Sequence, residues 1–295
     1  MEPDVLVAGA GPVGLALACA LLQHGVSVRV VDRAQAPATT SRANFVHARG
    51  SEVLDRLDAL SGLPEESVRA MTITNYAGDR PMMRVRFGDP GLHTAAPPME
   101  ISQARGAVAR PAGRAGRAAG NAGIGFPDVK VSERFLIVDA RLDTTLDRSG
   151  TSGRVHSEGM LTGIGDAENL AWKLALVIGG LAGERLLQTY EAERRPPATQ
   201  VLRGSTAATR MNIAAGPFGR FLRDRVMVPA FNLLVLQRWT TYTTSQLWVS
   251  YRRGPLGGRG SRPRPGDRIA AMLVRPDAHL ACTGDPTRWL DGALA

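Results

Sequence analysis

The segment DVLVAGAGPVG, residues 4–14, decides the fold of this chain. It opens with a short apolar run typical of a buried strand, and the pattern GxGxxG follows at Gly9, Gly11 and Gly14. Gly9 permits a tight turn, Gly11 lets the backbone approach a pyrophosphate, and Gly14 lets a helix lie close to the strand. Unpaired N–H groups at the positive end of that helix would bind the phosphates. The segment therefore predicts a dinucleotide-binding turn.

The residues around this turn fit a strand–helix–strand unit. Residues 12–24 carry small and aliphatic side chains on every face, as a helix packed on a sheet does, and Gly25 is a typical helix stop. Residues 26–31 are rich in valine and predict a second strand, parallel to the first because such crossovers are right-handed. Asp32 follows at the spacing expected for an acid that binds the adenosine ribose, and Arg33 is a neighbouring cofactor-binding candidate.

Composition indicates a folded chain of one or two domains, with 295 residues of which 44% are hydrophobic. No apolar run reaches the ~18 residues of a membrane-spanning helix, and the first residues lack the basic start and cleavage site of a signal peptide. We therefore expect a soluble, cytoplasmic protein with no membrane partner. The two cysteines cannot build a disulfide framework or a multi-thiolate metal site, so no metal is expected.

The net charge of +9 raises the question of nucleic-acid binding. Four arginines fall in residues 104–123, and the others are dispersed among acids without the aromatic residues that stack on bases. Nucleic acid is therefore not an expected partner. The same stretch contains 8 alanines and 5 glycines and has no periodic apolar face, so we expect it to lie outside the core.

Further elements follow from local patterns. Residues 71–86 predict antiparallel strands around a Gly-Asp turn, and residues 126–142 have strand-like patterning. A helix with one apolar stripe is predicted over residues 166–180, and a second from near Glu184, bounded by the two prolines at 196 and 197. Residues 252–264 are rich in glycine, arginine and proline and predict a linker.

Several segments share a pattern with one family of enzymes. They are SRAN at 41–44 with HARGSEVL at 47–54, ISQAR at 101–105, GMLTGIGDAENLAWKL at 159–174 and YEAERRP at 190–196. Taken in order with the glycine turn, they resemble the FAD-dependent aromatic hydroxylases, or class A flavoprotein monooxygenases. The similarity is greatest to hydroxylases of phenols and aromatic polyketides.

The resemblance implies an α/β fold: a Rossmann-like FAD-binding domain with a parallel sheet, remnants of a β-sheet substrate domain, and C-terminal helices. It also implies FAD as cofactor, NADPH or NADH as reductant, and an aromatic small molecule and O2 as substrates. In that family a C4a-hydroperoxyflavin hydroxylates the ring, a chemistry that belongs to the cofactor while the protein supplies position and electrostatics. The substrate and the oligomeric state stay open.

The resemblance also divides the chain into regions. These are a discontinuous FAD-binding domain (1–70, 101–121 and 151–200), a partial substrate-binding sheet domain (71–100 and 122–150), a helical segment (201–253), and a linker with the start of a truncated thioredoxin-like domain (254–295).

By the same resemblance, Arg42 lies near the flavin and Gln103 contacts it. Backbone N–H groups around Gly159, Met160 and Leu161 would face the pyrimidine edge of the flavin, where negative charge develops on reduction. No catalytic residue is assigned. Asp166 and Glu168 are interpreted as acids in a first helical turn that complement the helix dipole.

Two family motifs are missing: the GCDG-like motif beyond Gln103, and the Gly-Asp-Ala-Ala-His motif before Gly159. An alternative is therefore a catalytically inactive, internally deleted flavoprotein remnant. A further alternative, favoured by the first strand–helix–strand unit alone, is an NAD(P)-dependent Rossmann dehydrogenase. A flavin absorbance spectrum distinguishes these alternatives.

Overall fold

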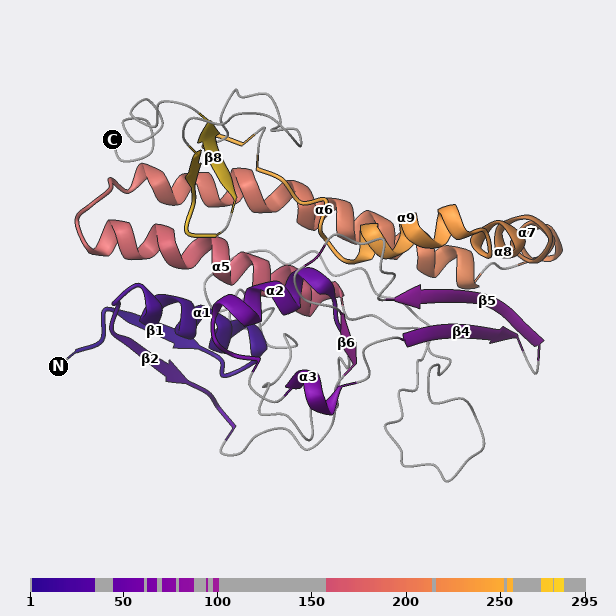
Figure 1. Ribbon diagram of the computed structural model, residues 1–295, viewed down its shortest axis with the longest axis horizontal. Helices are drawn as coiled ribbons and strands as arrows, with labels where there is room; N and C mark the ends of the chain where they lie inside the picture. Colours follow the sequence, from indigo (N-terminus) through magenta and orange to yellow (C-terminus); the bar gives the residue numbers. More distant parts are fainter. Residues whose placement is uncertain are drawn as a thin grey trace.

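A computed structural model describes the chain in segments (Figure 1). The described residues are 2–34, 45–60, 63–67, 71–77, 80–87, 94, 98–100, 158–213, 216–251, 254–256, 272–277 and 279–283. The candidate residues Arg42 and Gln103, the stretch 104–123 and the strand-like residues 126–142 lie outside them.

The N-terminal unit has the predicted strand–helix–strand order. Strand β1 (Val5–Ala8) leads to helix α1 (Pro12–Gln23), and strand β2 (Val28–Val31) returns parallel to β1. Pro12 opens α1, where a missing N–H group costs nothing. Gly25, just past the end of the helix, has a φ of +78°, in the left-handed region that favours glycine. The predicted parallel pair is confirmed.

A group of short strands and helices follows the N-terminal unit in the chain. Strand β3 (Phe45–Val46) pairs antiparallel with β6 (Met99–Glu100), and helix α2 (Ala48–Arg56) follows β3, with the short α3 (Leu63–Glu66) after it. Strands β4 (Met71–Ala77) and β5 (Arg80–Phe87) form the predicted antiparallel hairpin.

Two long helices form the centre of the molecule (Figure 1). Helix α5 (Glu158–Ile178) begins eight residues before the predicted start, because Met160, Leu161 and Ile164 continue its buried stripe toward the N-terminus. Helix α6 (Arg185–Ile213) runs on through the two prolines at which we expected it to end. Each proline lacks an N–H donor and its ring crowds the carbonyl four residues earlier, but the turn before the prolines is held by Glu193 and Arg194, whose charged groups are buried and hydrogen-bonded.

The remaining helices and strands follow α6. They begin with α7 (Pro217–Leu222), a π-helical turn η1 (Arg223–Met227), α8 (Val228–Phe231) and α9 (Leu234–Thr244). Helices α8 and α9 contact β5. Strands β7 (Met272–Val274) and β8 (Leu280–Thr283) pair antiparallel. The parallel strand pair, the antiparallel hairpin and the C-terminal helices together confirm the predicted α/β fold class. Within the described ranges, none of the helices combines the length and apolar character needed to cross a membrane.

Helix α5 packs along α1, and the two helices run in the same direction. Early residues of both helices, such as Ala16 and Ile164, share one buried cluster, while later residues, such as Leu21 and Ala171, share another. The N-terminal ends of α1 and α5 therefore lie at the same end of the core, next to the turn that follows β1.

Candidate functional site: the glycine turn and two helix ends

The turn between β1 and α1 requires glycine at two positions for two different reasons. Gly9 has a φ of +116°, and its N–H group donates to the carbonyl oxygen of Val31 at 2.7 Å. A Cβ atom at Gly14 would overlap the carbonyl oxygen of Gly9. Glycine at both positions therefore lets α1 start directly above the strand end.

Asp32 joins this turn to the end of β2. Its Oδ2 atom accepts the N–H group of Ala10 at 2.8 Å, and its Oδ1 atom accepts that of Ala34 at 2.7 Å. These two bonds orient the carboxylate toward the glycine turn. The neighbouring Arg33 is exposed.

The N-terminus of α1 is chemically open to an anion. Gly11 is its N-cap residue in an extended conformation, and neither a side-chain cap nor an acidic residue in the first turn neutralises this helix end. The first N–H groups of a helix lack partners within it and carry partial positive charge. The tight glycine turn and the N-terminus of α1 fit the pyrophosphate of a dinucleotide.

The three backbone positions predicted to face a flavin lie in the first turn of α5, ahead of residue 166, where we expected the helix to begin. Gly159, Met160 and Leu161 follow directly on Glu158, the first residue of the helix, and the side chains of Met160 and Leu161 are buried. Their N–H groups belong to the four that have no partner within α5. The partial positive charge proposed to face the flavin is therefore that of the N-terminal end of α5.

Contacts with α1 and α2 fix this end of α5. A Cβ atom at Gly163 would lie 2.5 Å from Cγ2 of Val13 in α1, and one at Gly50 in α2 would lie 2.9 Å from Cδ1 of Leu161. The structure therefore brings Gly9, Gly11, Gly14 and Asp32 together directly, and links them to the first turn of α5 through Val13.

The interpretation of Asp166 and Glu168 as first-turn acids is wrong, because α5 begins at residue 158. Asp166 instead accepts a hydrogen bond from Nε of Arg194 at 2.6 Å, and Glu168 accepts one from Nε of Arg56 at 2.9 Å. Burial raises the pKa of both carboxyl groups, although the arginines act in the opposite direction. These acids tie α5 to α6 and α2.

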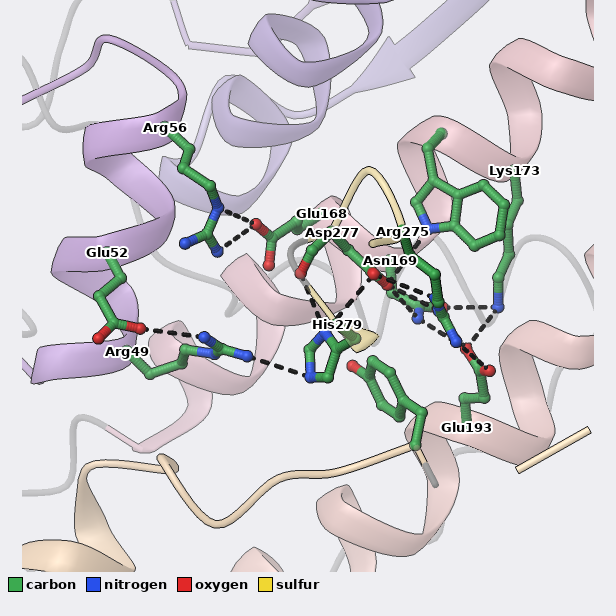
Figure 2. A network of polar contacts seen from close by, with 12 residues as sticks. Arg49, Glu52, Arg56, Glu168, Asn169, Lys173, Glu193, Arg275, Asp277 and His279 are labelled. Atoms are coloured by element: carbon green, nitrogen blue, oxygen red, sulfur yellow. Dashed lines mark hydrogen bonds and ion pairs between the residues drawn. The ribbon is translucent and has the colours of Figure 1, made fainter. Parts of the chain in front are cut away.

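Sequence reasoning missed a buried polar network beside the site (Figure 2). It joins α5, α6 and the turn between β7 and β8, which we call the 275–277 turn. Its members are buried and lie within hydrogen-bond distance of one another: Asn169, Trp172, Lys173, Glu193, Arg275 and Asp277. The available signal was Lys173, a lysine within the apolar stripe of a predicted helix.

Charges in this network are balanced. Lys173 donates to Glu193 at 2.9 Å. Arg275 donates to the same carboxylate at 2.6 and 2.8 Å, and to Asp277 at 2.7 Å. Burial acts to raise the pKa of Glu193, but the hydrogen bonds and charges of its partners outweigh it and hold the pKa below the usual value. The pKa of Asp277 is likewise lowered, because its hydrogen bonds with His279 and Arg275 and the charge of Arg275 outweigh burial. Two buried cations thus neutralise two buried carboxylates.

In the described part of the chain, histidine, cysteine and acidic side chains nowhere gather in a group of three or more that could hold a metal ion. The arrangement at this edge of the apolar core consists of a glycine turn and the N-terminal ends of α1 and α5.

Residues 2–108 and 155–205, more than half of the chain, match the FAD binding domain family, and the chain belongs to that family. The match covers both the glycine turn and helix α5. It confirms the resemblance to flavoproteins and supports FAD as the cofactor.

The relatives of this chain include monooxygenases. A segment of 95 residues is 42% identical to 6-methylpretetramide 4-monooxygenase of Streptomyces rimosus, which is 32% of this chain but only 17% of that protein. The matched segment therefore spans less than a fifth of the length of this relative. This likeness agrees with the resemblance to the aromatic and polyketide hydroxylase family.

Solved structures show the same fold. The structure superposes on OxyS anhydrotetracycline hydroxylase from Streptomyces rimosus with a TM-score of 0.68 at 20% identity, covering 97% of this chain and 96% of that one. The rebeccamycin biosynthetic enzyme RebC with reduced flavin superposes with a TM-score of 0.67 at 18% identity, with 99% of both chains covered.

Proposed function

We propose that this chain is the flavin-binding part of a monooxygenase that hydroxylates an aromatic small molecule, using O2 and NADH or NADPH. The observation that carries the proposal is the parallel packing of α1 on α5, with Gly163 against Val13, which puts the positive N-terminal ends of both helices beside one glycine turn. Bound FAD would supply the redox chemistry, since it accepts hydride from the nicotinamide and activates oxygen.

The described residues would divide the binding work among them. The α1 end would bind the pyrophosphate through its N–H groups, and Asp32 would accept a ribose hydroxyl. The first turn of α5 would direct its N–H groups at the pyrimidine edge of the flavin, where they stabilise the charge of the reduced form. Met160 and Leu161, which are buried, would exclude water from that side. Arg42 and Gln103 remain candidates for flavin contacts by family resemblance.

An aromatic substrate of the phenol or polyketide type is proposed from the relatives. The region assignments made from the sequence, with 71–100 and 122–150 as substrate sheet and 254–295 as linker and thioredoxin-like start, are retained as proposals.

The direct test is FAD binding by the full chain. The purified protein is titrated with FAD and followed by flavin absorbance and by the quenching of flavin fluorescence. Saturable binding at a stoichiometry of one supports the proposal, whereas a protein that binds NADH but not FAD would favour the dehydrogenase alternative. Oxygen uptake with phenolic polyketides, with catalase present or absent, then separates hydroxylation from peroxide release and from an inactive remnant.

A further inference from the structure

The 275–277 turn holds two helices of the FAD-binding unit at once. Arg275 places both terminal nitrogens on the carboxylate of Glu193 in α6, and Asp277 accepts Nδ2 of Asn169 and Nε1 of Trp172 in α5, both at 3.2 Å. Arg275 also bonds Asp277, so the contacts to α5 and α6 meet in a single pair (Figure 2). A segment about 80 residues or more from these partners in sequence thereby fixes α5 relative to α6.

The same turn reaches helix α2. His279 has its Nε2 atom 3.1 Å from a terminal nitrogen of Arg49, and its Nδ1 atom 2.9 Å from the carbonyl oxygen of Asp277. Arg49 in turn pairs with Glu52 at 3.0 Å. Because a guanidinium only donates, Nε2 of His279 accepts and Nδ1 carries the proton that is donated to Asp277. The turn and His279 together therefore contact α2, α5 and α6.

Loss of one charge from this network cannot be absorbed locally. Lys173, Glu193, Arg275 and Asp277 are all buried and their charges cancel. Removal of the Arg275 charge leaves a net negative charge away from water, which is unfavourable unless the elements separate to admit solvent. Three members of the network, Asn169, Trp172 and Lys173, belong to α5, so a rearrangement of the network acts directly on this helix.

Movement of α5 is transmitted to the cofactor end. Asn169 lies nine residues beyond Met160, roughly 13 Å along a rigid helix, and the contact between Gly163 and Val13 has no spare room. From this we propose that Arg275 and Asp277 are positioning residues, which set the place of the first turn of α5 against α1 and thereby tune flavin binding. This proposal rests on the proposed function above.

The test compares variants of the full chain. Arg275→Met removes the charge, Arg275→Lys keeps the charge but loses the two-pronged contact, and Asp277→Asn keeps the size of the side chain. The matched control is Arg195→Met, which removes the same charge from an exposed ion pair with Glu191 on α6. Backbone hydrogen exchange is measured at residues 162–167, the first N–H groups of α5 that bond within the helix.

Faster exchange at residues 162–167 in Arg275→Met, with an FAD dissociation constant raised about tenfold and a shifted flavin midpoint potential, is the expected result. Arg275→Lys should recover part of each effect, and Arg195→Met should match the original protein. A lower melting temperature with unchanged exchange at 162–167 and unchanged FAD affinity would overturn the proposal. If Arg275→Met does not fold, the same readouts on Arg275→Lys and Asp277→Asn decide.

The two proposals fail in different ways. If the original chain binds no FAD, the proposed function falls, and the tuning of flavin binding falls with it, whatever the exchange shows. If the chain binds FAD and the variants at 275 and 277 leave exchange and affinity unchanged, only the positioning role falls.

Discussion

Gly163 of α5 lies so close to Val13 of α1 that an added methyl group would sit 2.5 Å from the Val13 Cγ2 atom. This contact joins the two helix ends of the proposed flavin site. It also explains the glycine at position 163 of α5, because a larger residue there would separate the helices.

Gly163→Ala should therefore lower the free energy of unfolding by ~1–3 kcal/mol, the usual cost of overpacking, and weaken FAD binding. The double variant Val13→Ala/Gly163→Ala should recover much of both losses, because the shorter side chain frees the space. Gly204→Ala is the control: this exposed helical glycine in α6 has open space at its Cβ position, so alanine should stabilise by ~0.5–1 kcal/mol. Urea unfolding and FAD titration measure these effects. A Gly163→Ala variant as stable as Gly204→Ala would contradict the close contact with Val13.

Asp32→Ala should raise the FAD dissociation constant about ten- to a hundredfold, since it removes a charged hydrogen-bond acceptor worth ~1.5–3 kcal/mol. Asp4→Ala provides the control at the opposite end of the same strand pair, where Asp4 accepts the N–H group of Ser27 at 2.9 Å. It should leave FAD affinity unchanged. Equal affinities in both variants, measured by titration, would remove Asp32 from the site.

The buried His47 should make stability depend on pH. Burial lowers the pKa of His47 from 6.5 to about 3, so below pH 6.5 the unfolded chain binds a proton that the folded chain does not. Stability is therefore lost as pH falls from about 6.5 toward 3, by up to ~1.4 kcal/mol per pH unit. His47→Asn, which keeps a good residue at the start of α2, should flatten this slope in unfolding curves at several pH values. An unchanged slope would mean that other groups produce it.

Lys173→Met should cost ~3–5 kcal/mol, because it leaves the buried carboxylate pair with one cation too few. A second change, Glu193→Gln, restores neutrality, so the double variant should be less destabilised than the two single costs combined. At the surface, Arg195→Met should cost less than ~0.5 kcal/mol, since its ion pair is exposed. Chemical denaturation of the original chain and of the four variants provides the comparison. A cost for Lys173→Met no larger than that for Arg195→Met would show that the network is hydrated.

The sequence by itself determined the local elements. The glycine spacing, the valine-rich strand and Asp32 predicted the strand–helix–strand unit, because turn geometry and crossover handedness depend on nearby residues. The Gly-Asp turn likewise predicted the hairpin of β4 and β5. The matched segments also indicated the flavoprotein family before any contact was known.

Only the tertiary structure decided how the distant parts meet. The extension of α5 to residue 158 and the passage of α6 through its prolines depend on burial against other helices, which overrides local helix signals. The pairing of Arg275 with Glu193, 82 residues apart, follows no periodicity in the chain. Charged side chains such as these normally lie at the surface, and burial becomes favourable only when the fold brings a partner of opposite charge to each of them.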